Sequence, residues 1–225
     1  MEHFSLHALS ELPLLQGLAR EELNRFATTV PHQLKQYAPG DILLSAQAPC
    51  RGLWIMTSGT ADMSRTANNG RFTLHELAQA PMVIQPEVLY GIAPRHTAQV
   101  CALSPCQVLF IPKEGVTQLM QHYEVFRLNM LNMLSATIYK RERQAWHDRS
   151  GGTEKRITQF LHALVSTPAG QKTLDISMQE LAHQIHTPRM KVSAALAGMQ
   201  AKGQLQLSRR RITVPAMEQL IQAYS

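Results

Sequence analysis

The chain has 225 residues, 44% of them hydrophobic, and its 22 Lys and Arg outnumber its 16 Asp and Glu to leave a net charge of +6. This hydrophobic fraction supports one large or two small folded domains and excludes wholesale disorder. No run of about 18 apolar residues occurs, so we expect no membrane span, and the first residues lack the pattern of a signal peptide.

Cysteine content and charge distribution narrow the setting. Cys50, Cys101 and Cys106 are an odd number without a Cys-x-x-Cys pair, which favours a reducing cytoplasm over a disulfide framework. Residues 151–225 hold 9 Lys and Arg against 4 Asp and Glu, whereas residues 1–150 hold 13 against 12. We therefore expect a polyanionic partner for the last third of the chain.

Two short helices are predicted first, at residues 6–16 and 19–28, the second with Glu21 and Glu22 in its first turn. From about residue 33 to 112, short apolar runs alternate with turn signals such as Asn68-Asn69-Gly70. Strands at this spacing predict an all-β roll or sandwich.

A single long helix is predicted over residues 113–148, because no proline or glycine follows Gly115. Its apolar stripe consists of Phe126, Met130, Met133 or Leu134, and Thr137 or Ile138. The stripe can pack on its own domain or pair with a second copy, and we expect a homodimer. With a hinge at Ser150-Gly151-Gly152, the expected domains are 1–116, 117–149 and 150–225.

The last domain contains a predicted helix-turn-helix after an amphipathic helix at 154–166. Ser177 and Glu180 have capping-box spacing, and Leu181 and Ile185 face inward on the short helix that follows. Thr187 is the expected N-cap and Pro188 the first residue of a second helix, which runs to about Lys202 and ends at Gly203. Two helices joined this tightly form a helix-turn-helix.

The exposed start of the second helix and a basic hairpin after it predict DNA binding. Arg189 can bind guanine bidentately, and Ser193 can contact a base or a phosphate. Strands at 204–207 and 211–214 enclose an arginine-rich turn that forms a wing. The expected DNA contacts are Gln179, Thr187, Arg189, Met190, Lys191, Ser193, Arg209, Arg210 and Arg211. No nucleophile elbow, phosphate-cradling loop or catalytic carboxylate pair occurs, so we expect no enzyme.

The sequence resembles the Crp/Fnr family of transcription regulators. Gln179-Glu180-Leu181-Ala182 and Lys202-Gly203 resemble its helix-turn-helix, and residues 37–43 and 53–60 resemble segments of its β-roll. The resemblance implies an α+β chain made of an N-terminal β-roll, a long dimerisation helix and a winged helix-turn-helix. It implies a DNA-binding regulator, with double-stranded DNA, a second copy and RNA polymerase as expected partners.

Departures from the family pattern argue against a response to cyclic AMP. The family's Gly-Glu pair falls near Gln85-Pro86, with Glu87 one residue late, and its phosphate-binding arginine falls on His96, ahead of Thr97. A neutral imidazole cannot replace a guanidinium on phosphate. Glu87, His96 and Thr97 thus line a candidate pocket for another effector. We expect no cofactor and no metal, since residues 1–49 hold no cysteine for an iron–sulfur cluster. The segment Gln79-Ala80-Pro81 is similar to the corresponding segment in a divergent enterobacterial group of this family.

One alternative stays open at this point. The chain can instead be a small-molecule, redox or haem sensor whose β-roll acts mainly through protein contacts. Cys101 and Cys106 are the candidate redox pair, although small apolar fillers are the simpler interpretation. His96 or His75 is the candidate haem ligand, although isolated histidines in strands are more often structural. The basic wing beside a recognition helix favours the DNA-binding interpretation.

Overall fold

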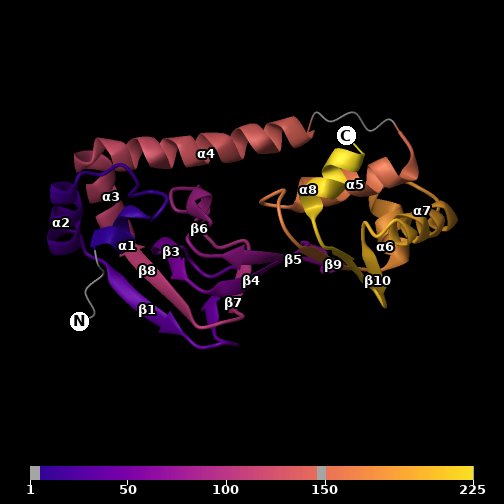
Figure 1. Ribbon diagram of the computed structural model, residues 1–225, viewed down its shortest axis with the longest axis horizontal. Coiled ribbons are helices and arrows are strands. Elements are labelled where there is room, and N and C mark those ends of the chain that lie inside the picture. Colours follow the sequence, from indigo (N-terminus) through magenta and orange to yellow (C-terminus); the bar gives the residue numbers. More distant parts are fainter. Residues whose placement is uncertain (1–5, 146–150, 225) are drawn as a thin grey trace. The chain divides into compact units, whose positions relative to one another are not determined.

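The structure is a computed structural model that describes residues 6–145 and 151–224 and combines helices with antiparallel strands (Figure 1). The chain forms two compact units. The first contains residues 1–62 and 78–139, and the second contains residues 63–77 and 140–225. The expected α+β class is confirmed. Within the described ranges no helix is both long and apolar enough to cross a membrane.

The first unit contains the expected β-roll. One antiparallel sheet has the order β1-β8-β3-β6, and β2 pairs with β7. Apolar side chains of β3 and β8, including Leu53 and Leu109, share a core with Leu9, Phe26 and Leu119 from three helices. The elements are α1 (Leu6–Ser10), α2 (Arg20–Thr29), β1 (Gln33–Tyr37), β2 (Ile42–Leu44), β3 (Gly52–Ser58), β6 (Met82–Ile84), η1 (Pro86–Val88), β7 (Gln99–Ala102) and β8 (Cys106–Pro112).

The predicted single helix over 113–148 is in fact two helices. α3 (Lys113–His122) and α4 (Glu124–Ala145) are separated by Tyr123, which has an extended backbone with φ −122° and ψ 101°. Tyr123 is 3% exposed and belongs to the core of the first unit, so packing of this side chain accompanies the break in the helical ladder. The expected end at Asp148 lies outside the described residues.

The apolar stripe predicted on this helix is divided between two faces. Phe126 and Met130 are buried in the core of their own unit, and Met133 and Leu134 pack against it. These four side chains therefore pack within their own chain, which is the first of the two alternatives predicted for the stripe. Ile138, the last residue predicted in the stripe, is 66% exposed and lies with Leu128 and Leu131, which were not predicted and are each 49% exposed.

A long hairpin links the β-roll to the second unit. Its strands are β4 (Thr60–Thr66) and β5 (Phe72–Gln79), and residues 63–77 belong to the second unit. β5 pairs in antiparallel fashion with β9 (Lys172–Ile176), with Leu74 opposite Leu174 and Glu76 opposite Lys172. The second unit therefore contains a strand that lies about a hundred residues away along the chain.

The second unit is a winged helix-turn-helix with this added strand. Its sheet has the order β10-β11-β9-β5. Leu74 joins the core under the helices, and Phe72 stacks edge-on against Phe160 with ring centroids 5.8 Å apart. Its other elements are α5 (Thr153–Leu164), α6 (Met178–Gln184), α7 (Arg189–Ala201), β10 (Gln206–Ser208), β11 (Arg211–Val214) and α8 (Met217–Ala223).

Candidate nucleic-acid interface

Local signals define the first helix of the helix-turn-helix. The hydroxyl of Ser177 accepts a hydrogen bond of 3.1 Å from the backbone N–H of Glu180, which makes Ser177 the predicted N-cap of α6. The carboxylate of Glu180 does not form the other half of a capping box. It accepts hydrogen bonds from Gln184 at 2.8 Å and Arg71 at 3.3 Å instead.

The turn between α6 and α7 spans residues 185–188 and places His186 in the left-handed region with φ +50°. The expected N-cap of α7 is wrong by one residue, because Pro188 caps the helix and Arg189 begins it. Thr187 is buried, and its hydroxyl donates to the carbonyl of Ile185 at 3.1 Å while accepting from Arg156 at 3.4 Å. Its hydroxyl is thus engaged within the turn, which argues against the predicted DNA contact of Thr187.

The start of α7 is exposed, as a recognition helix requires. Arg189, Lys191 and Ser193 are exposed, and Met190 is 80% exposed. The opposite face, with Val192, Ala195, Leu196 and Met199, is buried in the core of the second unit. Gly203 has φ +70° just past the C-terminus of the helix, where its N–H binds the carbonyl of Gln200. Gln179, the remaining predicted contact of the helix-turn-helix, is exposed on α6.

The wing is a two-residue turn. Ser208 of β10 pairs with Arg211 of β11, so Arg209 and Arg210 form the tip. Among the described residues, neither side chain of this tip has an ion-pair or hydrogen-bond partner. Arg210 has φ +60°, an uncommon conformation for a residue other than glycine. The two guanidiniums are therefore available to an outside anion.

Arg211 is already paired inside the unit. Its Nε and Nη2 donate to the two carboxylate oxygens of Asp175 at 2.6 and 2.8 Å. Hydrogen bonding to Arg211 lowers the pKa of Asp175, and His75, 3.5 Å away, adds to this effect. The predicted phosphate contact by Arg211 is therefore weakened by an internal partner, unlike those of Arg209 and Arg210.

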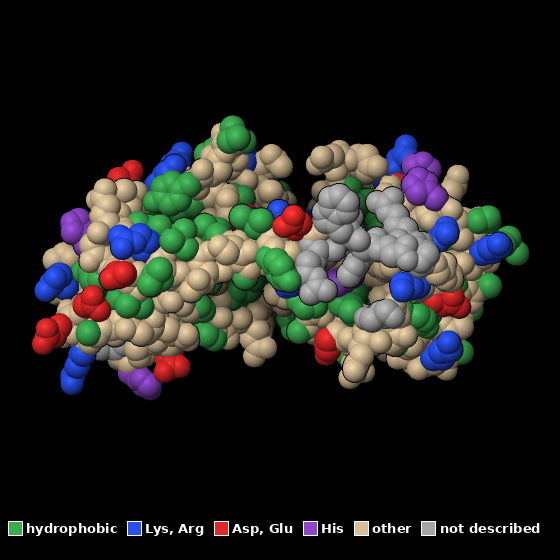
Figure 2. Space-filling view, turned by 90° about the horizontal axis from the view of Figure 1, so that it is seen from above, with side chains coloured by type: hydrophobic (Ala, Val, Ile, Leu, Met, Phe, Trp, Pro, Cys, Tyr) green, Lys and Arg blue, Asp and Glu red, His purple; other side chains and the backbone are tan. Residues whose placement is uncertain are grey.

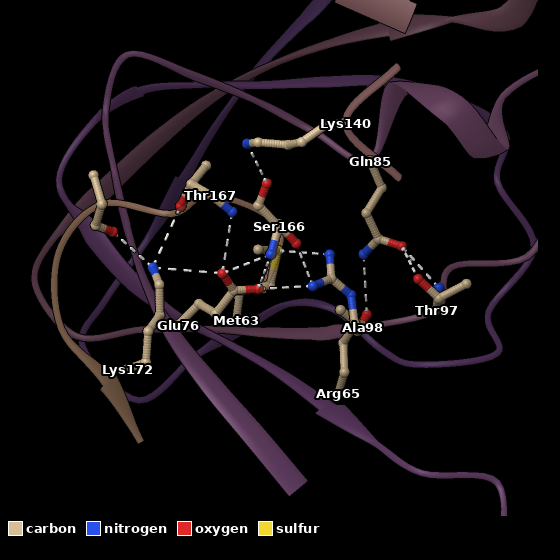
Figure 3. A network of polar contacts seen from close by, with 11 residues as sticks. Met63, Arg65, Glu76, Gln85, Thr97, Ala98, Lys140, Ser166, Thr167 and Lys172 are labelled. Atoms are coloured by element: carbon tan, nitrogen blue, oxygen red, sulfur yellow. Dashed lines mark hydrogen bonds and ion pairs between the residues drawn. The ribbon is translucent and has the colours of Figure 1, made fainter. Parts of the chain in front are cut away.

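The hairpin strand β5 is joined to the rest of the second unit by a buried ionic network (Figure 3). The carboxylate of Glu76 lies 2.7 Å from Arg65 and 3.5 Å from Lys172, and Glu76 and Lys172 are each 2% exposed. The backbone N–H groups of Ser166 and Thr167 also donate to it. Three separate segments of the second unit thus meet at one carboxylate.

The two compact units differ more in net charge than the two parts compared in the sequence, because residues 63–77 add a net +1 and residues 140–150 a net +2 to the last third of the chain. The second unit holds 15 Lys and Arg against 7 Asp and Glu, a net of +8. The first holds 7 against 9, a net of −2. The helix-turn-helix, the wing and the tip of the hairpin all belong to the basic unit, which matches the electrostatic requirement of a DNA-binding surface.

Thr97, one of the three predicted effector contacts, is bound by a side chain of its own unit. Gln85 has a left-handed backbone, and its carboxamide oxygen accepts from both the N–H and the hydroxyl of Thr97, at 2.7 and 3.0 Å. Its amide nitrogen donates to the carbonyl of Ala98 at 3.4 Å (Figure 3). The polar groups of Thr97 that an effector would use are therefore satisfied by Gln85.

His96 offers no positive charge at the same place. It is 1% exposed, and within the described residues neither ring nitrogen has a hydrogen-bond partner. Burial lowers the pKa of His96, and the carboxylate of Glu87 opposes this shift only in part. The imidazole is therefore neutral at pH 7 and is not suited to bind a phosphate.

Cys106, one member of the candidate redox pair, is buried and hydrogen-bonded within its unit. The Sγ of Cys106 donates to the carbonyls of Thr60 and Ser104, both at 3.2 Å, and burial raises its pKa. A raised pKa disfavours the thiolate that disulfide chemistry needs. In residues 6–145 and 151–224, no three His, Cys, Asp or Glu side chains are grouped as metal ligands.

Residues that tie the hairpin to the basic unit were not found from the sequence. Their partners lie far away along the chain, so no sequence motif or spacing predicts them. These residues are Arg65, Arg71, Glu76, Lys172 and Asp175. The one available signal was Arg71, which directly follows the predicted Asn68-Asn69-Gly70 turn and therefore had to lie near a hairpin tip.

Comparison with protein families matches both halves of the chain. Residues 34–123 match the cyclic nucleotide-binding domain, and residues 155–223 match the Crp-like helix-turn-helix domain. The first match includes the hairpin residues 63–77, which the structure assigns to the second unit. No curated protein matches the sequence.

Solved structures share the fold at low sequence identity. The catabolite activator protein of Thermus thermophilus is 18% identical over 95% of this chain and 100% of its own, with a TM-score of 0.50. A protein of Eubacterium rectale described as of the Crp/Fnr family is 18% identical over 95% and 98%, with a TM-score of 0.51. The sensor domain of the regulator DNR from Pseudomonas aeruginosa is 17% identical over 61% and 90%, with a TM-score of 0.51.

Proposed function

The chain belongs to the Crp/Fnr family of DNA-binding transcription regulators, and from this premise we propose that it reads operators through α7 and the wing, as a homodimer and without cyclic AMP. One observation carries the proposal. The exposed start of α7 and the unpaired Arg209 and Arg210 belong to a unit with a net charge of +8. The alternative of a sensor that acts only through protein contacts gives no reason for this basic surface.

Selection of bound genomic fragments, followed by footprinting on the selected duplex, tests the proposal. Two recognition helices related by a dyad should protect major grooves about one helical turn apart. Arg189→Ala should cost about 1–3 kcal/mol of discrimination at one base pair per half-site. Neutralising Arg209 and Arg210 together should weaken all duplexes alike. If Arg189→Ala retains the full preference of the parent, α7 is not the reading helix.

The homodimer is supported by an exposed stripe on α4. Leu128, Leu131 and Ile138 follow a spacing of three and then seven residues, with Ser135 between the last two, which is the a/d pattern of a helix pair. Figure 2 shows hydrophobic side chains among polar and charged ones on the surface seen from above. We keep the expected division into β-roll, dimerisation helix and DNA-binding domain, and add the hairpin 63–77 to the last.

Lack of a cyclic AMP response is supported by the state of the effector pocket. A cyclic phosphate needs a positive fork and free N–H donors. Gln85 already binds the N–H of Thr97, His96 is neutral, and Pro86 has no N–H. Isothermal titration with cyclic AMP and cyclic GMP should show no binding at micromolar concentration. Low-micromolar binding that disappears in His96→Ala would contradict the proposal.

The remaining parts of the proposal follow from DNA binding. The regulator would act in the cytoplasm, where its DNA target and RNA polymerase are located, and RNA polymerase is the protein partner that such a regulator would contact. It would catalyse no reaction. In vitro transcription from a selected operator, with and without the protein, tests the link to RNA polymerase.

A further inference from the structure

The tip of the β4–β5 hairpin and the wing lie at the same end of one sheet. β5 places Phe72 opposite Ile176 of β9, and β11 places Arg211 opposite Asp175 of the same strand. Since both pairings are antiparallel, the turns that precede Phe72 and Arg211 emerge together at the C-terminal end of β9. The register therefore brings the hairpin tip beside the predicted phosphate-binding turn.

A basic groove separates these two turns. It has a volume of about 540 Å³ and is lined by segments 70–73 and 208–211 together with Asp175. Four of its lining residues are arginines, Arg71, Arg209, Arg210 and Arg211, and one is a carboxylate. Asp175 is bound in bidentate fashion by Arg211, so positive charge remains in excess in the groove.

Arg71 keeps most of its side chain accessible. Its Nη1 lies 3.3 Å from a carboxylate oxygen of Glu180, but its side chain is 61% exposed whereas that of Glu180 is 9% exposed. Glu180 is held in place from the other side by Gln184. A guanidinium has five N–H donors in a planar fork, so one contact with Glu180 leaves donors that face solvent.

We propose that the hairpin tip is a third DNA-contacting element and that Arg71 binds a backbone phosphate adjacent to those bound by Arg209 and Arg210. This rests on the DNA-binding function proposed above. A segment that lies within the match to the cyclic nucleotide-binding domain would thereby touch the operator directly.

The composition of the groove favours a phosphodiester backbone as its occupant. Pockets for small molecules are lined mainly by apolar and aromatic side chains, whereas this lining consists of two turns and four guanidiniums. Guanidiniums bind phosphate oxygens in bidentate fashion. The groove is also continuous with the wing, so a backbone held by Arg209 has the hairpin tip next to it.

A purely structural role for Arg71 makes an opposite prediction. If Arg71 only fastens the hairpin to α6 through Glu180, loss of either partner should have the same effect. If Arg71 binds phosphate, Arg71→Gln should weaken DNA binding, whereas Glu180→Gln should leave it unchanged or strengthen it by releasing the guanidinium. The two variants together therefore separate the roles.

The experiment measures affinity of the full chain for a selected operator duplex across a salt series. Arg71→Gln should reduce the slope of log K against log salt by about 0.9 per protomer, and affinity at 0.1 M salt by roughly five- to tenfold per protomer, without altering sequence preference. Arg25→Gln is the matched control, because Arg25 is exposed on α2 of the other unit and its loss changes net charge equally. Arg71→Lys should retain most of the salt slope.

Ethylation interference locates the contact. Ethylation of certain phosphates should weaken binding of the parent but not of Arg71→Gln. These phosphates should be next to the ones whose ethylation no longer weakens binding of Arg209→Gln. If Arg71→Gln has the same salt slope and the same footprint as Arg25→Gln, the inference is wrong but the proposed function stands. If the parent protein itself shows no selective binding to duplex DNA, both are wrong. Binding of sub-millimolar pyrophosphate that requires Arg71 but leaves the affinity for DNA unchanged would assign the groove to a free anion and overturn the inference.

Discussion

Glu76→Gln tests whether the buried network holds β5 against β9. The substitution keeps the side-chain shape and removes the charge that Arg65 and Lys172 surround, at 2.7 and 3.5 Å. Lys172 is 2% exposed and, among the described residues, keeps the hydroxyl of Thr167 and the carbonyl of Ala169 as neutral partners but no counter-charge at Glu76. Loss of one member of a buried ion pair costs about 3–5 kcal/mol, because the other charge stays desolvated without compensation.

Hydrogen exchange of the intact protein, followed on peptides that cover β9, measures this loss directly. Since about 1.4 kcal/mol corresponds to a factor of ten, Glu76→Gln should accelerate exchange of the β9 amides by about a hundredfold to a few thousandfold. Peptides from β3 and β8 in the first unit serve as the internal reference.

Two further variants make the result specific to the buried charge. Asp175→Asn removes an ion pair from the same sheet whose partners are 34% and 52% exposed, so it should cost no more than about 1 kcal/mol. Combining Glu76→Gln with Lys172→Met should recover most of the lost protection, because no charge is then left buried at that register. If Glu76→Gln exchanges no faster than Asp175→Asn, the network does not secure the strand.

Three other predictions concern both units. Burial lowers the pKa of His96 in the folded protein, so as pH falls below about 6.5 the imidazole is protonated first in the unfolded chain. The first unit should therefore lose stability as pH falls from about 6.5 to the lower pKa of the folded state. His96→Leu should abolish this pH dependence of the thermal unfolding temperature. Leu131→Asp with Ile138→Asp should shift the protein to monomer in sedimentation, whereas Ala136→Asp, on the same helix but outside the stripe, should not; a parent that already sediments as a monomer refutes the dimer. Arg210 has φ +60°, which glycine adopts without strain, so Arg210→Gly should raise the stability of the second unit by up to about 1 kcal/mol in urea unfolding. The same substitution should weaken binding to every duplex. If Arg210→Gly binds DNA with the affinity of the parent, Arg210 is not part of the interface.

Patterns local in sequence predicted the DNA-binding half of the fold well. The cap at Ser177, the buried face of α7 and the left-handed Gly203 depend on neighbours within a few residues, so their physics is contained in short segments. The one-residue error at Thr187 shows the limit of this reasoning. A threonine before proline suits a helix cap, but burial of its hydroxyl among Ile185 and Arg156 decided otherwise.

Periodicity on the long helix could not decide between partners. An apolar stripe shows that a face is buried, but it does not say whether the same chain or a second copy buries it. Phe126 and Met130 turned out to belong to the core of the first unit, and the face with Leu131 and Ile138 is the one left exposed. Similarly, the break between α3 and α4 at Tyr123 could not be predicted, because no proline or glycine lies at that position.

By itself, the sequence predicted the class of both halves, the exposed second helix of the helix-turn-helix and the basic wing, and its resemblance to the family predicted that His96 takes the place of the phosphate-binding arginine. Only the tertiary structure decided that β5 completes the sheet of the DNA-binding unit, that Glu76 neutralises Lys172, and that Arg71 shares a groove with the wing. The physical reason is that cross-strand pairing joins residues about a hundred positions apart. From the sequence alone, a charged residue such as Lys172 is expected to be exposed to solvent. Its ion-pair partner is known only once the register of the paired strands is known.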